Sequence, residues 1–179
     1  MGLFSFLLGR CSKQPAEQSP HANGNGGQSP PAARFSELSP SDKARLDKQR
    51  AVIAEEAKRR YGTSSLAKTK ADLAVIQRLL DDKAFTKDQM YELQCMGVVF
   101  GDALASEMPL RWVMVTDEFG TDPTLRFKDT TIQLNALTMI AKRVEDGVEA
   151  LDVTNLFAGS QKVVVDMEAD FEREKAQKK

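Results

Sequence analysis

The stretch LQCMGVVFGDALASEMPLRWVMVTDEFGTDPTLRFK, residues 93–128, decides the fold of this chain. Its first half is rich in small and apolar residues and ends at a Met-Pro pair, which is typical of a buried helix that stops before a proline. Apolar residues then alternate from Leu110 to Asp117, and this alternation predicts a strand with both faces largely covered. An acidic turn and a second strand at residues 124–128 follow, so the helix leads directly into a hairpin.

Two glycines, Gly97 and Gly101, lie four positions apart inside this predicted helix. Each costs about 1 kcal/mol relative to alanine in a helix interior. We therefore expect another backbone to approach the helix closely at these positions. The helix should begin at Thr86, because Thr86 and Gln89 have the spacing of a capping box.

The chain before this stretch predicts two amphipathic helices. The first covers residues 41–61, with Ser41 as its N-cap and Gly62 after its last turn, and the second covers residues 66–83. Basic residues of the first helix alternate with acidic ones, which indicates a solvated face rather than a nucleic-acid patch. The basic residues near its start are Lys43, Arg45, Lys48 and Arg50.

The chain after the hairpin predicts a third strand at residues 131–134 and two helices, capped by Asn135 and Asp152. The charged end from Glu168 onward should fray. Links this short between strands produce an antiparallel meander. The predicted fold is α+β, with helices packed on a three-stranded antiparallel β-meander in the order ααα-βββ-αα, as one domain over residues 35–175.

The beginning of the chain differs in composition from this domain. Residues 12–33 are rich in Gln, Ser, Pro, Asn and Gly, with little apolar surface to bury. We therefore predict that residues 1–34 form a disordered tail or linker with a short apolar start. No basic residue precedes that start, so a signal peptide is not expected. Residues 1–10 allow two interpretations. They form a frayed terminus, or they contact a membrane surface or a partner.

Composition excludes several classes of function. With 25 Lys plus Arg against 26 Asp plus Glu, the net charge of -1 gives no field that would attract nucleic acid. No apolar run reaches the ~18–20 residues of a membrane-spanning helix. Cys11 and Cys95 provide neither a disulfide framework nor a ligand spacing, which favours a cytoplasmic location. His21 lies in the predicted linker, where it cannot be held against a nucleophile or metal. We predict no cofactor.

Asp102 and Trp112 are the first candidates for a site. Asp102 follows a glycine in an apolar helix, and a half-buried carboxylate requires a cationic or amide partner. A structural ion pair is favoured over a catalytic acid. Trp112 on a strand belongs to the core in the simpler interpretation, and to the wall of a binding groove in the other. The cations considered for Asp102 are Arg111, Arg126, Lys142 and Arg143.

The acidic turn gathers Asp117, Glu118 and Asp122 within six positions. Three carboxylates this close could bind calcium or magnesium. Their spacing does not fit the twelve-residue calcium loop, and no terminal glutamate closes the set. We therefore favour a polar hairpin turn over a metal site.

Residues 66–157 resemble a bacterial family known as a domain of unknown function, number 3806. In that family a Leu-Gln...Gly...Gly-Asp helix precedes a Trp strand, an Asp-Glu...Gly turn and a Thr-Met-Ile...Lys-Arg helix. The resemblance implies a bacterial source and no particular activity. The matching positions are Leu93, Gln94, Gly97, Gly101, Asp102, Trp112, Asp117, Glu118, Gly120, Asp122, Pro123, Thr138, Met139, Ile140, Lys142 and Arg143.

The sequence favours a non-enzymatic binding or protein-interaction module, because no placed histidine, nucleophile or metal cluster supports a reaction. One alternative is a small enzyme that uses Asp102 or Glu118 as general acid or base, with Lys142 or Arg143 as anion holder. The other is a peripheral membrane adaptor. The exposed binding face is expected to carry Trp112, Asp117, Glu118 and Arg126. The candidate binding residues are Asp102, Trp112, Asp117, Glu118, Arg126, Lys142 and Arg143.

Overall fold

The computed structural model describes residues 33–62, 65–118, 120–148 and 150–177. The predicted apolar start and most of the predicted linker lie outside these residues. The helices are α1 (Pro40–Tyr61), the 3-10 helix η1 (Lys70–Asp72), α2 (Leu73–Asp81), α3 (Met90–Glu107), α4 (Ala136–Glu145) and α5 (Val153–Gln177). The strands are β1 (Arg34–Ser36), β2 (Leu110–Asp117), β3 (Gly120–Phe127) and β4 (Gln133–Leu134).

The sheet has four strands rather than the predicted three. All its pairs are antiparallel, and the strand order is β1-β2-β3-β4. The additional strand, β1, precedes the first helix, so the predicted order ααα-βββ-αα was wrong. A strand of three residues is too short to show an alternating pattern, and β1 exists because Phe35 pairs with Val115 of β2. The predicted domain boundary at Phe35 falls inside this strand.

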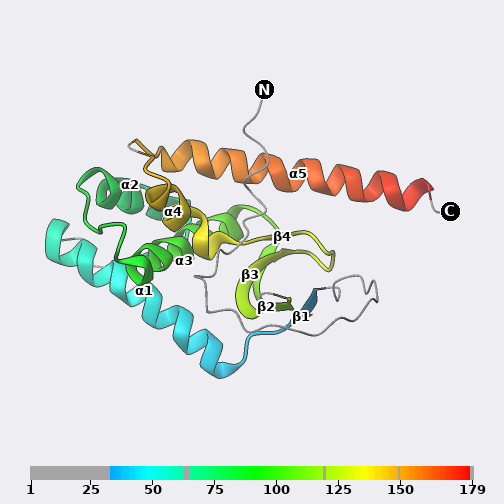
Figure 1. Ribbon diagram of the computed structural model, residues 1–179, viewed down its shortest axis with the longest axis horizontal. Coiled ribbons are helices and arrows are strands. Elements are labelled where there is room, and N and C mark those ends of the chain that lie inside the picture. Colours follow the sequence, from blue (N-terminus) through cyan, green and yellow to red (C-terminus); the bar gives the residue numbers. More distant parts are fainter. Residues whose placement is uncertain (1–32, 63–64, 119, 149, 178–179) are drawn as a thin grey trace, which may run out of the picture.

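Helix α3 is the central element of the molecule. Every residue from Cys95 to Leu104 is buried, which confirms the prediction of a buried third helix. Figure 1 shows α1 to α4 gathered beside the curved sheet, with α5 running along one side of the molecule. Lys128, just after β3, forms an ion pair of 2.5 Å with Glu168 of α5. The helix continues to Gln177, past Glu168, the residue from which the sequence predicted fraying.

The two glycines of α3 are both required by close packing. A Cβ atom on Gly97 would lie 2.7 Å from the carbonyl oxygen of Ala136, and it would also overlap the carbonyl of Leu137. A Cβ atom on Gly101 would overlap the Trp112 ring and would lie 2.9 Å from its Cη2 atom. The expected approach of another backbone is therefore confirmed at Gly97, where α4 begins. At Gly101 the neighbour is an indole ring instead.

The starts of two helices differ from the prediction. Ser39, not Ser41, caps α1: its hydroxyl accepts the N–H of Asp42 at 3.2 Å, and the Asp42 carboxylate accepts the Ser39 N–H at 3.0 Å. Helix α3 starts at Met90 rather than near Thr86. The Thr86 N–H still donates to Gln89 Oε1 at 3.0 Å, so the predicted pair forms a turn ahead of the helix.

Strand β1 supports a first testable prediction. We expect a chain that begins at Arg34 to keep the melting temperature of the full chain. A chain that begins at Glu37 should melt about 4 °C lower, a shift that corresponds to about 1 kcal/mol, because it lacks Phe35, whose ring lies 4.5 Å from the Arg126 guanidinium. Thermal melts of the three chains test this. Equal melting temperatures would place β1 outside the cooperative fold. A lower melting temperature for the chain that begins at Arg34 would show that residues before Arg34 contribute to stability.

Candidate functional site

Asp102 of α3 is tied into a structural network. Its side chain is 7% exposed. Arg50 of α1 donates from Nε to Oδ2 at 2.5 Å and from Nη2 to Oδ1 at 2.7 Å. The indole N–H of Trp112 donates to Oδ1 at 2.9 Å. Both carboxylate oxygens are therefore occupied, and the bidentate pair fastens α1 to α3.

The sequence-based choice of a partner for Asp102 was wrong. The partner is Arg50, which the sequence placed on a solvated helix face, although its side chain is only 14% exposed. Three of the four predicted cations contact other groups: Arg111 pairs with Asp129 at 2.8 Å, Arg126 donates to the Thr130 carbonyl, and Arg143 donates to the Met139 carbonyl.

The predicted exposed face does not form one surface. Trp112 pairs with Leu125 across β2 and β3, whereas Arg126 pairs with Arg111. Because neighbouring residues of a strand point to opposite faces, Trp112 and Arg126 lie on opposite faces of the sheet. Trp112 is half-buried against α3, and only Glu118 of the predicted face is exposed.

A polar cavity of about 350 Å³, here called the α1–α4 cavity, brings together residues from five elements. Gln94 of α3 and Thr138 and Lys142 of α4 line it, as do Asp117 and Asp122 of the β2–β3 hairpin. Helix α1 contributes two further residues, Arg45 and Gln49. Several of these positions, Gln94, Asp117, Asp122, Thr138 and Lys142, are among those that carry the family resemblance.

Gln49 is the unusual residue of this cavity. Its side chain is 4% exposed, and its Oε1 atom has no hydrogen-bond donor in the described part of the chain. A buried acceptor without a donor costs about 1–3 kcal/mol, so such atoms are rare and need a reason. Gln49 is a residue of the cavity lining, and its unpaired Oε1 atom is buried beside that lining.

The α1–α4 cavity carries charges of both signs. Arg45 and Lys142 bring positive charge to its lining, and Asp117 and Asp122 bring negative charge. Asp117 and Lys142 also interact within the protein. Within the described ranges, no group of three or more His, Cys, Asp or Glu residues is arranged to hold a metal ion. This mixture suits a small polar molecule with groups of both charges.

The other chemical candidates are less suited to a site. Cys95 is buried, and burial raises the pKa of its thiol to about 11, so the thiolate needed for nucleophilic attack is scarce at neutral pH. A larger cavity of about 650 Å³ lies beside Leu80, Phe85 and Val148. Neither of the two buried unpaired polar atoms of the described chain, in Gln49 and Gln133, borders it.

Comparison with known proteins agrees with the resemblance found in the sequence. Residues 72–157 match the family model described as a domain of unknown function (DUF3806). No curated protein matches the chain. The fold is similar to that of a crystal structure from Bacteroides thetaiotaomicron VPI-5482, with a TM-score of 0.65 and 13% identity. The match covers 77% of this chain and 50% of the other, so this chain spans about half the length of that protein. At that identity the likeness concerns the fold alone.

Sequence reasoning identified part of the α1–α4 cavity. It named Asp117 and Lys142 as candidate binding residues, and both line the cavity. It missed Arg45, Gln49 and Thr138, because an amide or a hydroxyl on a helix carries no pattern that separates a binding residue from a surface residue. Among the described residues, no helix is long and apolar enough to cross a membrane.

Proposed function

We propose, for a chain whose residues 72–157 match the model of the DUF3806 family, that the protein is a non-enzymatic module that binds a small polar ligand in the α1–α4 cavity. The observation that carries the proposal is Gln49, whose buried Oε1 atom lacks a donor within the described residues and which lines a cavity that also contains cations and carboxylates. A protein keeps such an atom at a cost to stability when binding requires it. A bacterial, cytoplasmic setting is part of the same proposal, and the free thiol of Cys95 supports it.

The network around Asp102 favours binding over catalysis. A general acid or base must reach the substrate proton, and the oxygens of Asp102 already accept hydrogen bonds from Arg50 and Trp112. Asp102 does not border the α1–α4 cavity. Glu118, the other predicted acid, is exposed on the hairpin turn. The membrane-adaptor alternative concerns residues 1–10, which lie outside the described residues.

The substitution Gln49→Leu tests the proposal. Leucine has a similar size and needs no hydrogen bond, so the free energy of unfolding should stay the same or rise by up to about 1 kcal/mol. Binding in the α1–α4 cavity should be lost. Binding is measured by calorimetric titration of the full chain with glutamine, glutamate, lysine and glycylglycine, and the variant is then titrated with the same compounds. Denaturant melts measure stability.

Gln133→Leu is the matched control. Gln133 also has a buried Oε1 atom without a donor in the described chain, but it does not border the α1–α4 cavity. The Gln133→Leu protein should show a similar change in the free energy of unfolding, and its ligand binding should be unaltered. If a ligand that the full chain binds is held equally well by Gln49→Leu, the cavity is not the binding site.

A further inference from the structure

Arg143, near the end of α4, carries a partly buried charge without an ion pair in the described part of the chain. Its Nη1 atom donates to the Met139 carbonyl at 2.7 Å, and no carboxylate of the described residues lies within 4 Å of it. Burial lowers the pKa of this guanidinium below its ordinary value, and the nearby charge of Asp146 offsets that shift only in part. A guanidinium withdrawn from water in this way favours pairing with an anion.

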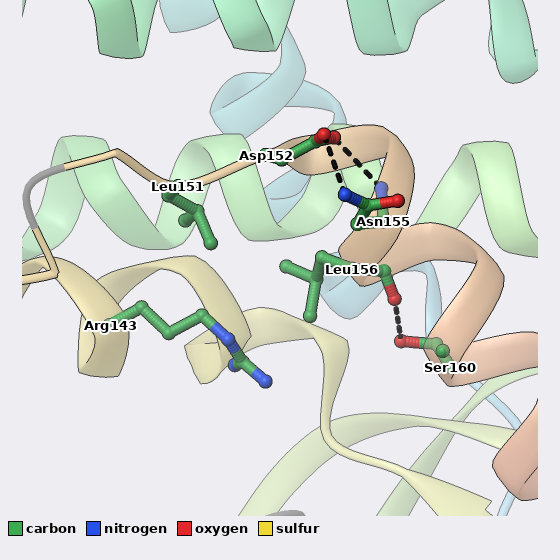
Figure 2. A pocket seen from close by; sticks show the side chains of 7 residues that line it. Arg143, Leu151, Asp152, Asn155, Leu156 and Ser160 are labelled. Atoms are coloured by element: carbon green, nitrogen blue, oxygen red, sulfur yellow. Dashed lines mark hydrogen bonds between the residues drawn. The ribbon is translucent and has the colours of Figure 1, made fainter.

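The guanidinium borders a cavity of about 300 Å³ between α4 and the start of α5. Figure 2 shows the Arg143 side chain reaching from α4 toward α5, with Leu151 and Leu156 beside the same space. The cavity therefore presents a cation next to an apolar wall. Such a pairing fits a ligand with one charged end and one apolar end.

Gly159 of α5 is a second, independent feature of this cavity. A Cβ atom there would meet nothing within 4 Å, in contrast to Gly97 and Gly101 of α3. Its φ is not positive either, so neither packing nor backbone conformation requires a glycine. A glycine in a helix interior disfavours the helix relative to alanine, and what it provides here is open space above α5.

Asp152 limits which anion can enter. Its carboxylate also borders the cavity, and it accepts the backbone N–H of Asn155 at 2.9 Å and the side-chain amide of Asn155 at 2.7 Å. Its negative charge would repel a doubly charged phosphate more strongly than a singly charged carboxylate. The Ser160 hydroxyl donates to the Leu156 carbonyl at 2.8 Å, so Arg143 is the principal donor for an anion.

We propose that this cavity, here called the Arg143 cavity, is a second binding site, which holds a single carboxylate on a short apolar chain. The carboxylate pairs with the Arg143 guanidinium, and the apolar chain lies against Leu151 and Leu156. Such a carboxylate is found in a free aliphatic acid or at the C-terminus of a peptide that ends in an apolar residue. The inference does not depend on the α1–α4 cavity.

Titration of the full chain with hexanoate, hexanamide and inorganic phosphate tests the proposal, with amide chemical shifts as the readout. Hexanoate should bind with a Kd of about 1 mM or below and shift the signals of Gly159 and its neighbours, whereas hexanamide and phosphate should not. Equal binding of hexanamide would show a merely apolar pocket and overturn the proposal. Equal binding of phosphate, or no saturable shift with hexanoate, would also overturn it.

Two variants locate the binding. Arg143→Met should weaken hexanoate binding at least about tenfold, the loss expected for a charged hydrogen-bonded pair. Gly159→Leu should block the cavity while it keeps or raises the melting temperature, so it remains informative if Arg143→Met folds poorly. Unchanged hexanoate binding by Gly159→Leu would refute the location. Gln49→Leu should bind hexanoate normally, which separates this test from that of the α1–α4 cavity.

A leucine-ended tripeptide and its C-terminal amide distinguish the two sources. Tighter binding of the free-acid peptide than of hexanoate would assign the site to a chain end. Weaker binding would assign it to a free aliphatic acid. Either result upholds the carboxylate site, whereas equal binding of the acid and amide peptides contradicts it.

Discussion

The Asp102→Asn protein is expected to have a free energy of unfolding about 3 kcal/mol below that of the wild type. Asparagine keeps the shape of the side chain but leaves Arg50, only 14% exposed, with the exposed carboxylate of Asp47, 2.9 Å away, as its remaining counter-charge. Breaking one partner of a buried pair costs about 3–5 kcal/mol, because an uncompensated charge remains inside the protein. Asparagine can still accept the Trp112 N–H, so we expect the lower end of this range. Urea melts measure the change.

A double-mutant cycle separates the pair from its surroundings. The change Arg50→Met together with Asp102→Asn should cost less than the sum of the two single changes, because no buried charge remains unpaired. Asp129→Asn is the matched control, since the ion pair of Asp129 with Arg111 is exposed, and it should have little effect. A stable Asp102→Asn protein that no longer binds a ligand would assign Asp102 a direct functional role.

Gly97→Ala should destabilise the protein by about 2 kcal/mol despite the higher helix propensity of alanine. The added Cβ would lie 2.7 Å from the Ala136 carbonyl oxygen and would overlap the carbonyl of Leu137. Both are backbone groups at the start of α4, so relief requires α4 to move away from α3. Overpacking of this kind costs about 1–3 kcal/mol, and occasionally more. The gain of about 1 kcal/mol from replacing a helical glycine is smaller.

The matched control for this change is Gly159→Ala. A Cβ on Gly159 meets nothing within 4 Å, so the same chemical change should stabilise the protein by up to about 1 kcal/mol. Gly101→Ala should fall between the two, since its neighbour is the side chain of Trp112, which can adjust. Denaturant midpoints of the three variants test this order. A raised midpoint for Gly97→Ala would mean that α3 and α4 are not closely packed in solution.

Local patterns predicted the helices and the main hairpin, because the periodicity of apolar residues and the residues at helix ends act over short distances. They failed for β1 and for the partner of Asp102. Three residues cannot show an alternating pattern, and Arg50 lies 52 positions from Asp102. An arginine on a charged helix looks solvated until the tertiary packing of α1 is known.

The candidate site was predictable to the extent that it uses charged residues. The sequence identifies Asp117 and Lys142 as candidates because charged side chains are common in binding and catalytic sites. Gln49 does not, since an amide is ordinary on the surface of a helix. Only its burial and its missing donor identify it, and both are properties of the folded chain.

Helix α1 lies outside residues 72–157, yet it supplies Arg45 and Gln49 to the α1–α4 cavity and is fastened through Arg50. The lining of the cavity is therefore a composite of residues that match the family model and of two side chains from helix α1. In the binding function proposed above, the matched residues would act as a scaffold and helix α1 as a selector. Chains with this domain but a different leading helix would keep the scaffold and change what it recognises. Ligand preference in such proteins should follow the helix, and exchanging that single segment should transfer the preference from one chain to another.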